Sequence, residues 1–231
     1  MTGPALCCVW GRAYDLGMSL IYDTTMHPSK LELLAGWLPT QPWFTGDIAH
    51  LVSLGAYRFD DPEGEVGLEG YLLTAGDETV YHVPLSYRGA LLEGGESFVV
   101  GTSEHGVLGT RWINDATGDP VFRAVLAAKI AQGGSEEDLF LQSAEGELST
   151  LDRAVHVRGS GGPGSPVPEL WDAVVEDHGS RVELSTGFAA LEVRRVLNPA
   201  ESAGSVAPNA QVLRATWPGQ LDPVVLATLT V

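Results

Sequence analysis

The residues best suited to binding or chemistry lie close together between Gly101 and Pro120, in the sequence GTSEHGVLGTRWINDATGDP. Glycines in such a stretch let a ligand approach the backbone closely, and the polar side chains supply charge and hydrogen-bonding groups. The side chains that could contact a ligand are those of His105, Arg111, Trp112, Asn114, Asp115 and Asp119. The predicted ligand-binding residues are His105, Arg111, Trp112 and Asp115. The alternative is a long hairpin followed by a helix that Asp119 caps.

Trp43 is a further candidate for ligand binding. It stands in the aromatic, proline-containing segment Thr40-Gln41-Pro42-Trp43-Phe44, which is more typical of a packed corner. A tryptophan ring can also offer a flat apolar surface in a binding pocket. Trp43 and Trp112 are therefore the expected stacking surfaces if the protein carries an apolar or sugar ligand.

Ser103, Glu104 and His105 place a hydroxyl, a carboxylate and an imidazole side by side. Adjacent residues of an extended segment point to opposite faces, so only Ser103 and His105 can share one. The sequence contains no G-x-S-x-G elbow. These three residues are better interpreted as a turn or surface feature than as a nucleophilic site.

The motifs that bind nucleotide phosphates are missing or incomplete. A P-loop needs a lysine after glycine, but the lysines are Lys30 and Lys129 and neither follows one. No His-Arg-Asp catalytic loop of the protein-kinase type occurs. Residues 159–164, GSGGPG, match G-x-G-x-x-G, yet nearby prolines remove backbone donors and no parallel βαβ unit surrounds them. We interpret this segment as a linker.

The distribution of histidine and cysteine does not predict a metal centre. The histidines are His27, His50, His82, His105, His156 and His178, with no H-x-H or H-x-x-x-H pair among them. The cysteines, Cys7 and Cys8, are adjacent and far from any histidine cluster. A disulfide framework is excluded on the same grounds.

The sequence is strongly acidic, with 13 Lys plus Arg against 30 Asp plus Glu and a formal charge of −17. Such a charge repels phosphate backbones and anionic membrane surfaces, so neither nucleic acid nor a membrane is an expected partner. No apolar run approaches the roughly 20 residues of a membrane-spanning helix. We expect a soluble, cytoplasmic protein.

Turn residues and hydrophobic spacing predict an α+β fold, in which a curved antiparallel meander is flanked by a few helices. One helix should begin at Pro28 and stop at Pro39, and a second should follow Asp119-Pro120 and end at Gly133-Gly134. A short third helix is expected over Glu169–Val175. The predicted strands cover residues 57–59, 66–74, 79–87, 97–102, 110–114, 139–142, 154–158, 181–185, 190–197, 211–217 and 223–231.

The chain divides into three predicted regions. Residues 1–19 form an N-terminal extension that is disordered or precedes a true start at Met18. Residues 20–134 hold the first helix and meander, and residues 135–231 form a β-rich region packed with the first as one unit.

The segment Leu31–Gly46, LELLAGWLPTQPWFTG, resembles the Trp-Leu-x-x-Gln-Arg-Trp-Phe/Tyr-x-Gly opening of the maltokinase N-terminal cap domain. The strand Tyr81–Leu85 is similar to the central strand of that family. Residues 115–120 resemble its D-A-x-x-D-P passage into a helix. Pro42 stands where the family has arginine, so any contact of that arginine is missing here.

The resemblance covers residues 21–132, and the C-terminal segments Glu192–Arg195 and Thr216–Gly219 look like those of stand-alone actinobacterial cap-like proteins. In maltokinases the cap precedes two lobes that bind ATP and phosphorylate the sugar, and this sequence contains neither lobe. The resemblance therefore implies carbohydrate phosphorylation and glucan metabolism as the context, without the catalytic activity.

Three hypotheses follow for the function. The first is a non-catalytic cap-like module, without cofactor, that regulates or assembles with a separate carbohydrate kinase or glucan-metabolising enzyme. The second is a divergent sugar kinase using ATP, in which Arg88, Arg111 or magnesium would neutralise phosphate charge. The third is a small-molecule or sugar carrier.

Overall fold

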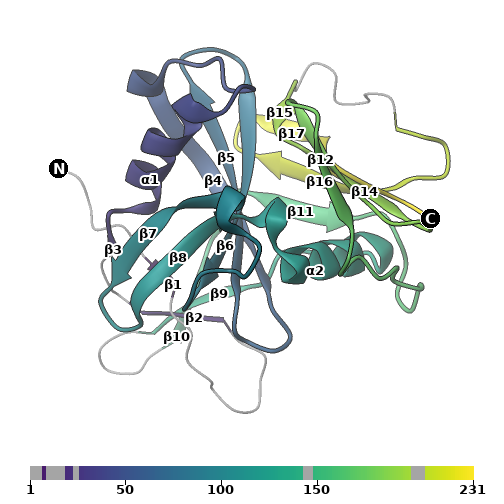
Figure 1. Cartoon of the computed structure of the whole chain (residues 1–231), viewed down its shortest axis with the longest axis horizontal. Helices are drawn as coiled ribbons and strands as arrows, with labels where there is room; N and C mark the ends of the chain where they lie inside the picture. The colour runs from purple at the N-terminus through teal and green to yellow at the C-terminus, as the bar shows by residue number, and fades with distance from the viewer. Residues whose placement is uncertain (1–6, 9–18, 23–25, 143–147, 199–205) are drawn as a thin grey trace.

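A computed structural model describes residues 7–8, 19–22, 26–142, 148–198 and 206–231. Figure 1 shows a large curved sheet flanked by helix α1 (Lys30–Trp37) on one side, and by helix α2 (Pro120–Ala131) and a second sheet on the other. Short 3-10 turns cover Leu38–Thr40, Ile48–His50, Glu96–Phe98 and Ala116–Gly118. In the described part of the chain, no helix is both long and apolar enough to cross a membrane.

The large sheet has the strand order β3-β7-β8-β6-β5-β4, and all its pairings are antiparallel. Its strands are β3 (Met26–His27), β4 (Leu51–Asp60), β5 (Gly67–Ala75), β6 (Val80–Arg88), β7 (Val99–His105) and β8 (Gly109–Asp115). The short strand β15 (Val196–Leu197) also pairs with β6, opposite Tyr81 and Val80. Because β15 comes from the C-terminal part of the chain, this pairing joins distant segments.

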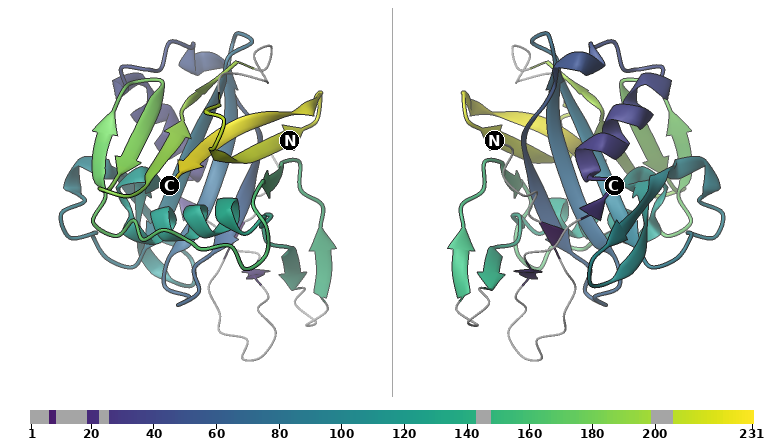
Figure 2. Two further views of the ribbon diagram at one scale, coloured as in Figure 1. Left: turned by 90° about the vertical axis from the view of Figure 1, so that its right-hand side faces the viewer. Right: turned by 90° about the vertical axis from the view of Figure 1, so that its left-hand side faces the viewer.

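The second sheet, here called the C-terminal sheet, is also antiparallel and has the order β11-β16-β17-β14-β13-β12. Its strands are β11 (His156–Gly159), β12 (Val174–Asp177), β13 (Arg181–Ser185), β14 (Ala190–Arg194), β16 (Gln211–Trp217) and β17 (Gln220–Thr230). A small sheet is formed by β1 (Cys7–Cys8), β2 (Ser19–Tyr22), β9 (Leu139–Gln142) and β10 (Leu148–Leu151). Figure 2 shows the C-terminal sheet lying over α2 beside the large sheet.

Apolar side chains cover both faces of the large sheet. One cluster lies between this sheet, α2 and the C-terminal sheet, and includes Tyr57, Leu72, Phe122, Ile130, Leu191 and Leu213. A second cluster lies under α1 and includes Leu34, Leu38, Trp43, Tyr81, Leu85 and Ile113. Residues from the predicted regions 20–134 and 135–231 thus share one apolar core. Burial of its nonpolar surface stabilises the contact between the two regions.

The α+β prediction is confirmed, since curled antiparallel sheets carry few, short helices. Asp119 caps α2, because its side chain accepts a hydrogen bond from the Val121 amide, and Pro120 occupies the first helical position as expected. The first helix begins at Lys30 instead of Pro28. The reason is a capping box, in which Ser29 accepts from the Glu32 amide and Glu32 accepts from the Ser29 amide.

The helix predicted over Glu169–Val175 is wrong. Leu170 and Ala173 are buried in the core, and β12 begins at Val174. A helix of one or two turns is marginal unless tertiary contacts support it. Here the Ala173 carbonyl instead accepts a hydrogen bond from Arg123 of α2, which fixes the segment in an irregular conformation. Within the predicted N-terminal extension, residues 1–6 and 9–18 lie outside the described residues.

Candidate functional site

The D-A-x-x-D-P passage, residues 115–120, forms a buried polar turn between β8 and α2. Oδ1 of Asp115 accepts hydrogen bonds from the amide and hydroxyl of Thr117, at 3.1 and 2.8 Å. Oδ2 of Asp115 accepts from Nη2 of Arg195, which follows β14, and the two residues are only 4% and 2% exposed. This ion pair connects the large sheet with the C-terminal sheet.

Asp119 completes the turn with a second ion pair. Its two carboxylate oxygens accept hydrogen bonds from Nε and Nη2 of Arg88, both at 2.7 Å, while Oδ1 also caps α2. This bidentate geometry is the strongest arrangement that an arginine and a carboxylate can form. The hydrogen bonds that Arg88 donates to Asp119 raise the pKa of its guanidinium against the opposing effect of burial.

Arg123 of α2 binds the turn from the other side. Its guanidinium donates to the carbonyls of Thr117, Gly118 and Ala173 at 3.0 to 3.1 Å. Burial lowers the pKa of this guanidinium, and the charge of Asp119 opposes the shift. We call the set Arg88, Asp115, Thr117, Asp119, Arg123 and Arg195 the polar junction. It holds β8, α2 and the chain after β14 in one arrangement.

A buried histidine makes a second polar connection between the sheets. Nδ1 of His82 lies 2.8 Å from the Arg194 carbonyl, and Nε2 lies 2.8 Å from the Tyr57 hydroxyl. A carbonyl only accepts, so Nδ1 carries the proton and Nε2 accepts from Tyr57. Burial lowers the pKa of His82 to about 4 and raises that of Tyr57. His82 is therefore neutral near pH 7.

The residues predicted to bind a ligand lie in different places. Nδ1 of His105 accepts from the amides of Val107 and Leu108, so the imidazole organises the β7–β8 turn. Asp115 lies at the opposite end of β8, about 20 Å away at the usual rise per strand residue. Trp112 is half-buried within that strand. The structure therefore separates His105 from Asp115, and a shared site stays a prediction.

Trp43 lies in the apolar cluster under α1 and is 6% exposed. Its ring contacts Trp37 edge-on, with centroids 5.9 Å apart, and also packs near Tyr81. The guanidinium carbon of Arg195 lies 5.2 Å from the Trp43 ring centre, which is within the range of a cation–π interaction. Trp43 and Asp115 are thus brought together by Arg195.

Ser103 and His105 share a face of β7, as the alternation of strand side chains predicts. Both are buried. The Ser103 hydroxyl donates to the Pro28 carbonyl at 2.7 Å and so attaches β7 to the start of α1. The turn interpretation therefore fits His105, whereas Ser103 lies buried within β7 and is neither a turn nor a surface residue.

The G-x-G-x-x-G match forms the C-terminal cap of α2. The amides of Gly161 and Gly162 donate to the carbonyls of Ile130 and Ala131, at 3.0 and 3.1 Å. A Cβ atom on Gly161 would lie 1.8 Å from the Ala131 oxygen, so only glycine allows this approach. The other two amides of this turn, those of Gly159 and Ser160, donate to the carbonyls of Gly134 and Val212, so these four amides are bound within the fold and do not point at a phosphate site.

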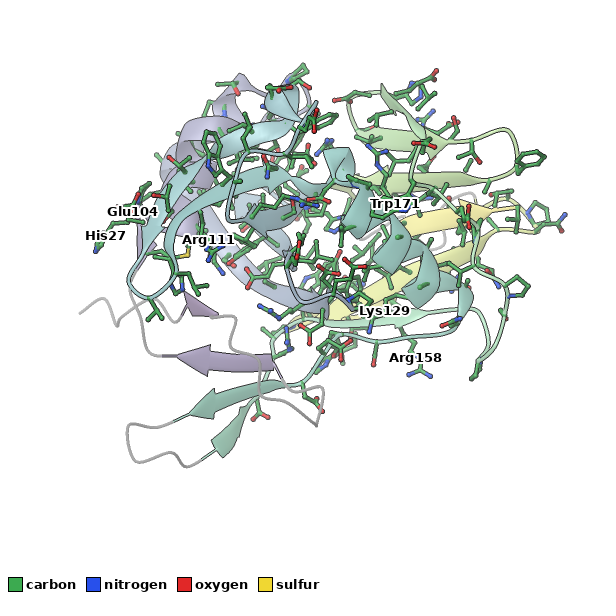
Figure 3. All side chains as sticks on the ribbon, turned by 60° about the horizontal axis from the view of Figure 1, so that its bottom comes forward. His27, Glu104, Arg111, Lys129, Arg158 and Trp171 are labelled. Atoms are coloured by element: carbon green, nitrogen blue, oxygen red, sulfur yellow. The ribbon has the colours of Figure 1, made fainter. Side chains whose placement is uncertain are left out.

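Two surface grooves lie next to the polar junction. One has a volume of about 410 Å³ and lies between α2 and the β4–β5 turn. Its floor is apolar, Trp171 stands at its border with 58% exposure, and Figure 3 shows this ring beside α2. We call it the α2 groove. Its lining residues include Asp60, Glu63, Val121, Ala124, Ala128, Glu137 and Trp171.

The other groove has a volume of about 650 Å³ and brings Arg88 and Arg111 together with Glu65 and Glu93. Arg111 donates to the Leu108 carbonyl at 3.1 Å, and its buried Nε has no hydrogen-bond partner among the described residues. Desolvation lowers the pKa of Arg111. Within the described residues, no group of three histidine, cysteine or acidic side chains is placed to hold a metal ion.

The residues that sequence reasoning missed are Tyr57, His82, Arg123 and Arg195. Asp115 and Arg195 are 80 residues apart, and no local spacing signals that they meet. His82 stands in a strand of apolar residues, where an isolated polar side chain is the one available sign of a buried hydrogen bond.

Part of the chain that includes Asp115 and Asp119 is similar to a known protein family. Residues 37–119 match the maltokinase N-terminal cap domain, from the end of α1 to the cap of α2. The predicted resemblance is confirmed for these residues. No curated protein matches the chain.

Proposed function

We propose that the chain is a non-catalytic, maltokinase-cap-like module that acts with a separate carbohydrate kinase or glucan-metabolising enzyme. The observation that carries the proposal is the polar junction. A catalytic aspartate of a phosphotransferase must reach the substrate hydroxyl or the metal. Asp115 and Asp119 are instead buried, and both are bound to arginines and to amides of the turn that they organise.

An accessory module needs a surface for its partner, and the α2 groove supplies suitable chemistry. Val121, Ala124, Val125 and Ala128 follow one face of α2 and form its apolar floor. Exposed tryptophan beside apolar surface is typical of the residues that contribute most to protein interfaces. Of the carboxylates in the lining, Asp60 pairs with Arg58, and Glu137 pairs with Lys129, which also lines the groove. Glu63 therefore supplies the charge that favours a basic side chain on an otherwise apolar partner segment.

The partner hypothesis is tested by calorimetric titration of the purified chain with a purified maltokinase. Binding is expected, and Trp171→Ala should weaken it by about tenfold or more, which is typical of an interface tryptophan. Phe188→Ala is the matched control because Phe188 is 93% exposed and lies outside the α2 groove. Its affinity should equal that of the unchanged protein.

The non-catalytic hypothesis has a separate test. The chain alone should transfer no phosphate from ATP to maltose or glucosamine. Transfer that is abolished by Asp115→Asn in a folded variant would overturn the proposal, because it would assign catalysis to the polar junction.

A divergent sugar kinase is the second candidate, and one observation favours it. Arg88 and Arg111 line the same groove, so two cations are available for phosphate charge. Arg88, however, is held by both oxygens of Asp119. Calorimetry with ATP and magnesium decides between the candidates, since a kinase must bind ATP and the proposed module need not.

A further inference from the structure

Two arginines lie directly opposite each other on the outer face of the C-terminal sheet. Arg158 of β11 is the register partner of Arg214 of β16. Their strand neighbours Val157 and Ala215 are buried in the core, so Arg158 and Arg214 point outward and both are exposed. Figure 3 shows Arg158 extending away from the ribbon.

Most other Lys and Arg side chains of the described residues pair with carboxylates, and Arg111 and Arg123 donate to backbone carbonyls. The described ion pairs join Lys30, Arg58, Arg88, Lys129, Arg181, Arg194 and Arg195 to carboxylates. No carboxylate of the described residues forms an ion pair with Arg158 or Arg214. Like charges directly opposite on neighbouring strands destabilise a sheet. The same sheet also opposes Arg181 to Arg194, but Glu192 pairs with both of these arginines. In a chain of net charge −17, an acid-free arginine pair is unexpected on stability grounds and points to a function.

The two arginines line a groove of about 390 Å³. That volume falls within the range of small-molecule sites. The groove also includes Ser160 and Thr216, whose hydroxyls can donate hydrogen bonds. Ser160 Oγ accepts from the Val212 amide at 2.8 Å, which fixes the oxygen and leaves its proton for a ligand. His156 also lines the groove, and its Nδ1 lies 2.7 Å from Oε1 of Glu136.

We propose that the Arg158–Arg214 groove binds the phosphate group of a small phosphorylated molecule. Two adjacent guanidinium groups carry two positive charges and planar sets of donors, which match a phosphate monoester with its charge of about −1.5 to −2 at pH 7. A carboxylate would neutralise only one of them. The net negative charge of the chain disfavours a polyanion such as nucleic acid. This site goes beyond the proposed accessory role and does not depend on it.

The test is calorimetric titration of the full chain with inorganic phosphate, glucose 1-phosphate and glucose 6-phosphate at low ionic strength. Saturable binding of at least one probe is expected, with a Kd below about 10 mM. Arg158→Gln and Arg214→Gln should each weaken it about tenfold or more, since hydrogen bonds to charged groups are lost. Equal affinities for the three probes would assign recognition to the phosphate alone, and tighter sugar phosphates would add contacts to the sugar.

Arg181→Gln is the matched control. Arg181 is an exposed arginine of the same sheet, but it lies on β13 and pairs with Glu192 at 3.1 Å. This variant should bind phosphate as the unchanged protein does. The proposal is overturned if no probe binds, or if all three glutamine variants weaken binding equally, because general surface charge would then account for it.

Folding of the variants is followed by thermal unfolding in the same buffers. Removal of either opposed arginine should raise Tm slightly without phosphate, because repulsion across the strands is removed. Added phosphate should raise the Tm of the unchanged protein and of Arg181→Gln, but not that of Arg158→Gln or Arg214→Gln. A Tm increase in all four proteins would contradict the site.

Discussion

The polar junction and the outer face of the C-terminal sheet use arginine in opposite ways. Arg123 and Arg195 are buried; Arg123 donates to backbone carbonyls, and Nη2 of Arg195 donates to the carboxylate of Asp115. Arg158 and Arg214 are exposed and face each other without an acidic partner among the described residues. The polar junction therefore uses its charges to connect the two sheets, whereas the charges of Arg158 and Arg214 are exposed on the outer face.

The largest loss of stability is expected from a substitution in the polar junction. Asp115→Ala leaves Arg195 buried without its carboxylate, and breaking a buried ion pair in this way costs about 3–5 kcal/mol. Urea unfolding followed by tryptophan fluorescence measures the loss. Asp138→Ala, at an exposed aspartate, should change stability by no more than about 0.5 kcal/mol. Equal losses in both variants would place Asp115 outside any structural role.

Acid should weaken the connection between the sheets through His82. Its pKa is about 4 in the folded protein, below the ordinary value of 6.5, so the unfolded chain binds the proton first. The contribution of His82 is complete above pH 6.5 and is lost as the pH falls toward 4. The loss is at most roughly 3 kcal/mol.

Unfolding free energies at pH 7 and pH 4.5 test this expectation. His82→Gln should have a smaller difference between the two pH values than the unchanged protein. If that variant does not fold, Tyr57→Phe serves instead: it removes the hydrogen bond that favours the neutral ring at Nε2, so its difference between the two pH values should also be smaller. An unchanged pH dependence in His82→Gln would show that other groups cause the acid loss.

The glycine-rich loop, residues 159–164, has one position where a side chain would clash, Gly161, and a neighbouring position with open space, Gly162. Gly161→Ala places a Cβ atom against the Ala131 carbonyl and should cost about 1–3 kcal/mol through displaced backbone. At Gly162 the nearest atom to an added Cβ is 3.9 Å away, so Gly162→Ala should be nearly neutral. Thermal unfolding of the two variants makes the comparison. Similar Tm values would mean that the loop does not cap α2.

The smallest effect is expected at the outer face, and it has the opposite sign. Arg214→Gln should stabilise the phosphate-free protein by about 0.2–1 kcal/mol, the range of a cross-strand pair. Raising the salt concentration should reduce this gain, since salt screens exposed charges. A loss of stability in Arg214→Gln would contradict this expectation, because Arg214 would then gain more from its contacts than it loses through repulsion by Arg158.

Much of the fold could be predicted from the sequence because its signals are local. Asp119-Pro120 marks the start of α2, and the turn Ala75–Glu78 separates β5 from β6. The helix predicted over Glu169–Val175 failed because long-range burial of Leu170 and the Arg123 contact decided that segment.

The site was less predictable because its contacts are not local. Asp115 was selected as a ligand-binding residue for its chemistry, but its partner Arg195 comes from a segment 80 residues later. The register that opposes Arg158 to Arg214 likewise depends on strand pairing between segments far apart in sequence. Residue types alone therefore identified charged groups without showing which ones are bound internally.

Asp115 and Arg195 join the two sheets through a direct ion pair, and a double-mutant cycle measures their interaction. The free energy of unfolding is measured for the unchanged protein, Asp115→Ala, Arg195→Met and the double variant. If the two side chains contact each other, the double variant should lose less stability than the sum of the single losses, by about 2 kcal/mol or more. Losses that add to within about 0.5 kcal/mol would contradict it, because independent sites behave in that way.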